Sequence, residues 1–213
     1  LTIRSDGHNR LTFEIDSIGG NCHLCGVSGV ISGVIGRSDS WATDGSDSKC
    51  EISFSADHSA LVVHPITTEE CRAYCGMRAG FDGTYRIPPT ACTSVGRQKT
   101  RDSFLKLYRS RRYVQAIETL QELITQCETF MSWMEMDQVR NDLALAQYHN
   151  GEFRQCLATL NSTLAAKVKD EEELKSGNSG VYLPPCDYDN YIEVAKSTWF
   201  NKALCTRAMS KKR

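Results

Sequence analysis

The sequence predicts an α+β protein, in which a small N-terminal antiparallel β-domain with a short helix is followed by an α-helical domain. Three observations predict this class. Apolar and polar residues alternate along residues 1–66, the pattern changes at residue 67, and apolar residues recur at helical spacing from about residue 97. We place a disulfide-stapled β-rich domain at 1–96 and a helical domain at 97–213, with a flexible insert near 169–182.

The strand-like alternation of the first domain is clearest over Leu11–Ile15 and residues 52–55, and a compact apolar run follows over Ala60–His64. Dipeptides typical of turns, such as Asp44-Gly45, separate these runs. We therefore expect a small antiparallel sheet or barrel.

A short helix is expected from residue 68 to about residue 80. Thr67 and Glu70 fit a capping box, in which the threonine oxygen accepts a hydrogen bond from the third helical amide. On this helix Cys71 and Cys75 lie on one face. We expect each of them to bond across that face and not to the other.

The second domain is expected to consist of helices. Apolar spacing and the Asn150-Gly151 break predict helices over 99–110, 112–127, 132–150, 152–167 and 189–209. Between the last two, residues 169–180 are polar and include the acidic run Asp170–Glu173. Such a composition predicts a flexible linker or a disordered loop.

Two of these helices repeat one another. Residues 112–120 (RYVQAIETL) and 152–160 (EFRQCLATL) share an aromatic, a glutamine, a small residue and a leucine in register, and Tyr108 and Tyr148 recur at the same spacing. This resembles the tetratricopeptide repeat, which commonly has a glycine where Gly151 stands. Arg111 occupies that place in the first unit, no proline closes either unit, and the period exceeds the usual ~34 residues. Two ordinary helical hairpins are the alternative.

The tetratricopeptide resemblance implies a fold and a role for the second half of the chain. Helical repeats stack on one another and create concave surfaces that hold peptides or protein partners. The resemblance also implies that Cys127, at the end of one helix, lies near Cys156 in the next repeat. We therefore expect a Cys127–Cys156 bond, provided that the geometry permits it.

Cysteine content predicts an oxidising compartment, because free thiols at this density are a hazard in a reducing cytosol. The ten cysteines are Cys22, Cys25, Cys50, Cys71, Cys75, Cys92, Cys127, Cys156, Cys186 and Cys205. Six lie in the first domain and four in the second, so each domain is expected to pair internally. The chain begins at Leu1 without a methionine, and we expect either that a signal peptide was removed or that the chain was trimmed there. The expected location is the periplasm or the extracellular space.

Zinc binding and thiol redox chemistry are the alternatives for these cysteines. The zinc ligands would come from Cys22, Cys25, Cys71, Cys75, His23, His58 and His64. A redox site would use Cys22 and Cys25, but their flanks predict strand and not the helix start that lowers a thiolate pKa. We favour disulfides.

Several function classes are excluded or disfavoured. The net charge of −1 argues against nucleic acid as the main partner, and no apolar run is long enough for a membrane span. No phosphate-binding loop, zinc-protease motif or nucleophile elbow is present. We expect no enzyme activity, no cofactor and no metal.

Binding to another protein is the function class that these exclusions leave. The polar loop 37–49 carries Asp39, Trp41, Asp44 and Asp47, and Tyr85 lies on another loop. Tryptophan and tyrosine are enriched at interface hot spots, and the aspartates suit a basic partner. The alternative is a solvated loop with a tryptophan that faces the core.

The N-terminal half loosely resembles bacterial periplasmic lysozyme inhibitors and immunity-type proteins, on its architecture and on segment 71–85. The resemblance implies an exported protein that binds another protein, such as a basic cell-wall hydrolase or toxin, as its inhibitor or immunity protein. The alternatives are a scaffolding repeat protein of the cell envelope and a thiol-redox or zinc protein.

Overall fold

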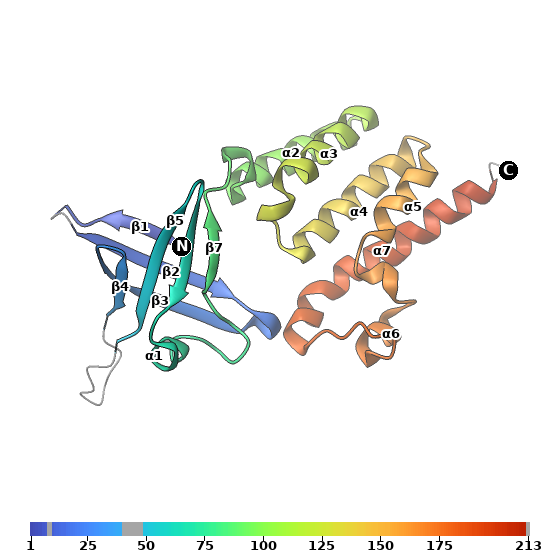
Figure 1. The fold of residues 1–213 in the computed structure, drawn as a ribbon. Helices are drawn as coiled ribbons and strands as arrows, with labels where there is room; N and C mark the ends of the chain where they lie inside the picture. Colours follow the sequence, from blue (N-terminus) through green and yellow to red (C-terminus); the bar gives the residue numbers. More distant parts are fainter. Residues whose placement is uncertain (8–9, 40–48, 212–213) are drawn as a thin grey trace. The chain divides into compact units, whose positions relative to one another are not determined.

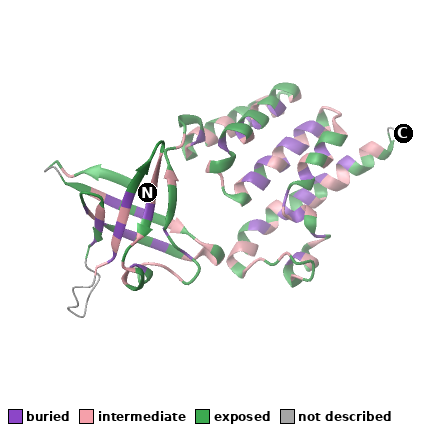
Figure 2. Cartoon of the chain, in the orientation of Figure 1, coloured by how far each residue is buried: buried purple, intermediate pink, exposed green. Residues whose placement is uncertain are grey.

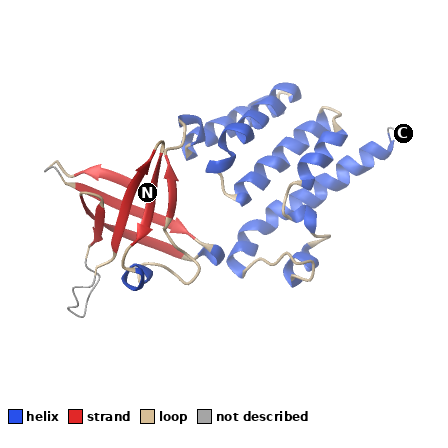
Figure 3. Cartoon of the chain, viewed as in Figure 1, coloured by secondary structure: helices blue, strands red, loops and turns tan. Residues whose placement is uncertain are grey.

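The computed structural model describes residues 1–7, 10–39, 49–211, and these form two units (Figure 1). The division falls between Ile87 and Pro88, earlier than the boundary expected after residue 96. All strands belong to the first unit and the long helices to the second (Figure 3). Each unit has its own buried core.

A single antiparallel sheet forms most of the first unit. Its strands are β1 (Thr2–Ser5), β2 (Leu11–Ile18), β3 (Leu24–Ser32), β4 (Ile35–Ser38), β5 (Glu51–Asp57), β6 (Ala60–Pro65) and β7 (Gly83–Arg86), with the 3-10 turn η1 (Gly20–Cys22) between β2 and β3. They lie in chain order, and each is antiparallel to the next. The sheet curves into a half-barrel.

The concave face of the half-barrel holds the core. On β2, Phe13 and Ile15 are buried while Glu14 and Asp16 are exposed, which is the alternation expected of a sheet with one face in solvent (Figure 2). The ring of Phe13 lies 5.4 Å from that of Phe54 on β5. Gly36 on β4 lets these rings approach, because a Cβ there would stand 2.6 Å from the Phe54 ring.

Two disulfides tie helix α1 (Thr68–Arg72) and the turn after it to the sheet. Cys71 bonds to Cys50 and Cys75 bonds to Cys25. The expectation that Cys71 and Cys75 do not bond to each other is confirmed. The helix ends well short of residue 80, and the predicted capping box is wrong, because the Thr67 hydroxyl accepts a hydrogen bond from the Glu51 amide and caps nothing on α1.

The second unit is helical. Its helices are α2 (Ser94–Arg109), α3 (Tyr113–Cys127), α4 (Trp133–His149), α5 (Phe153–Asn161), α6 (Glu171–Ser176) and α7 (Pro185–Lys211), with the 3-10 turns η2 (Thr90–Cys92), η3 (Glu128–Phe130) and η4 (Ala165–Lys167). Residues that these helices bury form three clusters, each shared between elements, and buried residues are purple in Figure 2. Helices α2 and α4 run parallel, because Arg97 pairs with Glu135 and, further along both helices, Arg101 pairs with Asp142. Helices α4 and α7 also run parallel, because Tyr191 bonds to Asp137 and, further along both, Thr198 bonds to Asn141.

The α+β class predicted from the sequence is wrong. The strands span residues 2–86 of one seven-stranded half-barrel, a helical region follows, and helix makes up 54% against 22% strand. The sheet, with the short helix α1, and the long helices therefore form separate units. The alternation missed β1 and β7, because a four-residue strand at a sheet edge is too short to show a period.

The two helical hairpins turn in the same way. Arg111 has φ +58° and Gly151 has φ +80°, both in the left-handed region. In the first turn the Arg112 amide bonds to the Leu107 carbonyl, and in the second the Glu152 amide bonds to the Gln147 carbonyl. The sequence repeat is thus a repeat of backbone geometry.

The disulfides of the helical unit differ from the expected pair. Cys127 bonds to Cys92, and Cys156 bonds to Cys205. Cys127 lies at the end of α3 beside η2, whereas Cys156 lies in the first half of α5 and faces α7. The six-to-four division also fails, because Cys92 belongs to the helical unit.

Part of the insert expected to be flexible is a helix. Asp170 accepts a hydrogen bond from the Glu173 amide at 3.0 Å and so caps α6. Leu174 is buried within the core formed with α7. The acidic run that indicated a linker is thus the first turn of a helix, where negative charge is favourable.

Candidate functional site

A groove of about 560 Å³ is lined by residues of α4 and α7, which contact each other at its base. It is lined from α4 by Gln138, Asn141, Asp142 and Leu145, and from α7 by Glu193, Val194, Lys196, Ser197, Phe200 and Asn201. These positions recur every three to four residues, so one stripe of each helix faces the groove. The hollow is therefore a property of how the two helices are spaced.

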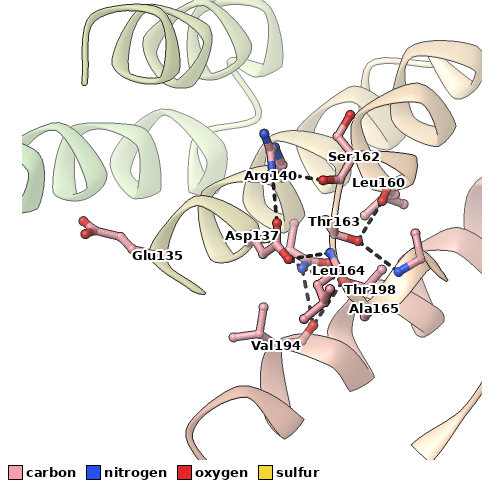
Figure 4. Close-up of polar contacts among 12 residues, drawn as sticks. Glu135, Asp137, Arg140, Leu160, Ser162, Thr163, Leu164, Ala165, Val194 and Thr198 are labelled. Atoms are coloured by element: carbon pink, nitrogen blue, oxygen red, sulfur yellow. Dashed lines mark hydrogen bonds and ion pairs between the residues drawn. The ribbon is translucent and has the colours of Figure 1, made fainter. Parts of the chain in front are cut away.

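Buried polar contacts fix that spacing (Figure 4). Asp137 on α4 is 3% exposed, and its carboxylate accepts hydrogen bonds from the Leu164 amide and the Tyr191 hydroxyl, both at 2.7 Å. Arg140 donates to the same carboxylate at 3.1 Å and to the Ser162 carbonyl at 3.0 Å. One side chain of α4 thus holds both α7 and the chain that follows α5.

Burial and the bond to Asp137 raise the pKa of Tyr191 above its usual range. The phenol therefore stays protonated and donates at any physiological pH. Its oxygen also accepts a hydrogen bond from the Ala165 amide at 2.9 Å. Both side chains are bonded to other buried groups of the protein, so we assign Asp137 and Tyr191 a structural role.

The base of the groove is lined with amides. Asn141 donates to the Thr198 hydroxyl at 2.9 Å, and Asn201 donates to the Asn141 side-chain oxygen at 3.2 Å. Both asparagines are nearly buried, at 5% and 6% exposure. Asn201 lines the groove and donates through its side-chain nitrogen, and no described residue donates a hydrogen bond to its side-chain oxygen. An acceptor in this position suits an amide N–H of a ligand.

Apolar side chains form part of the groove's walls. Phe200 is 65% exposed although it is a large aromatic residue, and Leu145 and Val194 are half-buried. Aromatic residues that stand exposed beside a hollow are typical of binding sites. Phe200 is therefore the residue of this groove most suited to anchor a ligand.

Charges of both signs border the groove. Asp142 receives a hydrogen bond from Arg101 at 3.3 Å, and Lys196 pairs with Glu193 at 3.1 Å. Burial raises the pKa of the Asp142 carboxyl, and the Arg101 guanidinium opposes that shift. Because positive and negative side chains both border the groove, it does not favour a ligand with a large net charge. Such a groove suits a polypeptide segment.

A second, smaller hollow of about 280 Å³ lies on the sheet. Glu14 and Asp16 on β2 and Asp39 after β4 border it, and Tyr74 also lines it. The Asp39 carboxylate accepts from the Ser28 hydroxyl at 3.3 Å, and the Tyr74 hydroxyl donates to the Asp39 carbonyl at 2.9 Å. Three carboxylates thus share one exposed region of the sheet.

Other residues proposed from the sequence have different surroundings. Trp41, Asp44 and Asp47 lie outside the described residues. Tyr85 is half-buried against the sheet core, and its hydroxyl donates to the Phe81 carbonyl at 2.5 Å. Burial raises the pKa of that hydroxyl. Of the two proposed binding residues that the structure describes, Asp39 lines the acidic hollow and Tyr85 does not.

The described cysteines are all disulfide-bonded, including Cys22 and Cys186. Cys25 bonds to Cys75, so Cys22-x2-Cys25 does not form the redox pair that was the alternative. Within the described chain, no three histidine, cysteine or acidic side chains gather in a way that would hold a metal. His23 accepts a hydrogen bond from the Arg78 amide at 3.3 Å, and the side chains of His58 and His64 are exposed.

Sequence reasoning missed the groove. The repeat pointed to a helical binding surface, but the groove needs α7, which lies outside the repeated segments. One signal was present in the sequence: Asn141 and Asn201 are polar residues at positions where the helical spacing predicts apolar ones.

No helix in the described part of the chain is both long and apolar enough to cross a membrane.

No protein-family model, no curated protein and no solved structure matches this chain. The resemblances to tetratricopeptide repeats and to lysozyme inhibitors therefore stay predictions, and the groove and the acidic hollow rest on their own geometry.

Proposed function

We propose that this is an extracytoplasmic protein-binding protein whose α4–α7 groove holds an extended segment of a partner. The observation that carries the proposal is the exposed Phe200 beside a groove of about 560 Å³ with an amide-lined base. The aromatic ring anchors an apolar side chain of the segment. The Asn201 oxygen accepts a hydrogen bond from its backbone.

The disulfides support the extracytoplasmic part of the proposal. Five disulfides are compatible with an exported protein, and none of the described helices is long and apolar enough to cross a membrane. The periplasm as the specific compartment is part of what we propose.

Peptide display tests the groove directly. A random peptide library is selected on the wild-type protein, and the affinities of the selected peptides are measured on Phe200→Ala and on Val114→Ala. Val114 is also an exposed apolar residue of the helical unit, at 52% exposure, but does not line the groove. We expect Phe200→Ala to weaken binding about 10- to 100-fold, as loss of an aromatic anchor does, and Val114→Ala to leave it unchanged. Equal affinities for both variants would place the site elsewhere.

Inhibition of a basic cell-wall hydrolase is the second candidate function. The observation that favours it is the acidic hollow of Glu14, Asp16 and Asp39, because an exposed acidic region steers a basic protein toward it. The test adds the protein to a lysozyme and measures muramidase activity. The double variant Glu14→Gln, Asp39→Asn should relieve inhibition, whereas Asp57→Asn, an exposed carboxylate away from the hollow, should not. A wild-type protein without effect on the enzyme contradicts this function.

A further inference from the structure

One end of the helical unit is strongly basic. Helices α2, α4 and α7 run parallel, so their C-terminal ends lie at the same end of the unit (Figure 1). Ring contacts of Tyr108 and Tyr113 with His149, at 5.6 and 5.3 Å, place the α2–α3 turn beside the end of α4. The Cys156–Cys205 bond places the start of α5 beside the end of α7.

Taken together, the three stretches that meet there contain far more lysine and arginine than acidic residues. Residues 106–114, 146–154 and 202–211 contain a single acidic residue, Glu152. Their cations are Lys106, Arg109, Arg111, Arg112, Arg154, Lys202, Arg207 and Lys211. Among the described residues none of these cations is in an ion pair, and all but Lys202 are exposed. We call this set the basic end.

Favourable interaction with helix dipoles does not account for the basic end. Cations near a helix C-terminus are stabilising, and that is the simplest explanation for each of them singly. The second hairpin, however, makes the same turn with Ala146, His149, Gly151 and Glu152 where the first has Lys106, Arg109, Arg111 and Arg112. The turn therefore does not need these charges.

Arg111 adds a second observation. Its φ of +58° lies in the left-handed region, where a side chain costs about 1 kcal/mol relative to glycine. The second hairpin has glycine at this place. A charged side chain retained in an unfavourable backbone conformation points to a function for the charge.

We propose that the basic end docks on an anionic phospholipid surface. Its cations are spread over the ends of three helices, and none of them lines either hollow described above, so a broad anionic surface can engage more of them at once than a small anion can. The half-buried tyrosines Tyr108, Tyr113 and Tyr148 lie among the cations, and amphipathic rings of this kind suit the headgroup region of a bilayer. Clusters of four to eight basic residues are typical of such binding.

Vesicle sedimentation tests this proposal independently of the groove. The full chain is mixed, at low and at physiological salt, with vesicles of phosphatidylglycerol and phosphatidylcholine and with vesicles of phosphatidylcholine alone. We expect binding to the anionic vesicles only, weakened by salt. Absence of binding to anionic vesicles at low salt overturns the proposal.

A matched pair of variants locates the surface. Arg109→Gln, Arg111→Gly, Arg112→Gln removes three cations of the basic end, and Lys167→Gln, Lys169→Gln, Lys175→Gln removes three exposed cations outside it. Each basic residue near an anionic surface contributes roughly a fivefold gain in binding, so the first variant should lose about 100-fold and the second less than 3-fold. Cooperative thermal unfolding of both variants, at a temperature no lower than that of the wild type, confirms that they fold. Equal losses, or binding to heparin without binding to vesicles, overturn the membrane assignment.

Discussion

The two helical hairpins share one backbone turn but differ in what surrounds them. In the second hairpin, α4 carries Asp137 and Asn141, which are buried and bond to Tyr191 and Thr198 of α7. At the matching places in the first hairpin stand Arg97 and Arg101, which reach across to acidic residues of α4. The comparison teaches that two hairpins can share a sequence pattern and a turn without sharing their buried polar residues. Those residues differ because each hairpin packs against a different neighbouring helix.

The largest effect is expected from Asp137. Replacement by alanine leaves the Tyr191 hydroxyl and the Leu164 amide without their acceptor, and we expect a loss of about 3–5 kcal/mol in the free energy of unfolding. Arg97→Ala, at the matching place, removes a pair with Glu135 that is partly exposed and should cost about 1 kcal/mol. Urea unfolding of both variants measures the difference. Similar losses would mean that the two hairpins are equivalent after all.

A smaller effect is expected from the disulfides. The Cys156→Ser, Cys205→Ser variant frees α7 from α5, and the Cys92→Ser, Cys127→Ser variant frees η2 from α3. Each should lose about 2–4 kcal/mol, because the closed loops are of similar length. Only the first bond holds a helix that lines the groove, so only the first variant should also weaken peptide binding. Calorimetry and peptide titration together check this expectation.

The two left-handed turn residues give a pair of opposite effects. Gly151→Ala should destabilise by about 1 kcal/mol, because the alanine Cβ is unfavourable at φ +80°. Arg111→Gly should stabilise by up to about 1 kcal/mol, because it relieves the same strain at φ +58°. Thermal unfolding measures both. Two changes of the same sign would contradict the shared turn geometry.

The smallest effect concerns the charge of Asp142. Burial raises the pKa of this carboxyl above its value in the unfolded chain, so its charged form disfavours folding at neutral pH. This cost disappears as pH falls through the raised folded-state pKa. The difference in stability between wild type and Asp142→Asn should therefore change between pH 7 and pH 4, with the wild type gaining relative to the variant. A difference independent of pH would show that Arg101 offsets the burial fully.

Much of the fold could be predicted from local pattern, and most of the site could not. Alternation identified β2 and β5, and apolar spacing identified α2, α3, α4 and α7, because these elements are long enough to show their period. A compact apolar run identified β6. The short edge strands β1 and β7 lack that signal. Cys127 was assigned to Cys156 because sequence spacing carries no information on which helix faces reach each other.

The groove escaped prediction for a similar reason. Its two walls come from α4, which ends at His149, and α7, which begins at Pro185, and part of the segment between them, near 169–182, was interpreted as a flexible insert. That segment is ordered because Leu174 packs in one core with Trp199 of α7. The Trp199 indole also donates a hydrogen bond to the Ala165 carbonyl at 2.9 Å. Tertiary contacts of this kind leave no periodic trace in a sequence.

Hydrogen exchange on the complex with a display-selected peptide tests the central claim most directly. The α4–α7 groove as binding site predicts slower exchange in residues 138–145 and 193–201 when peptide is added, with the α2–α3 turn unchanged. Protection confined to the sheet or to the first hairpin would contradict it.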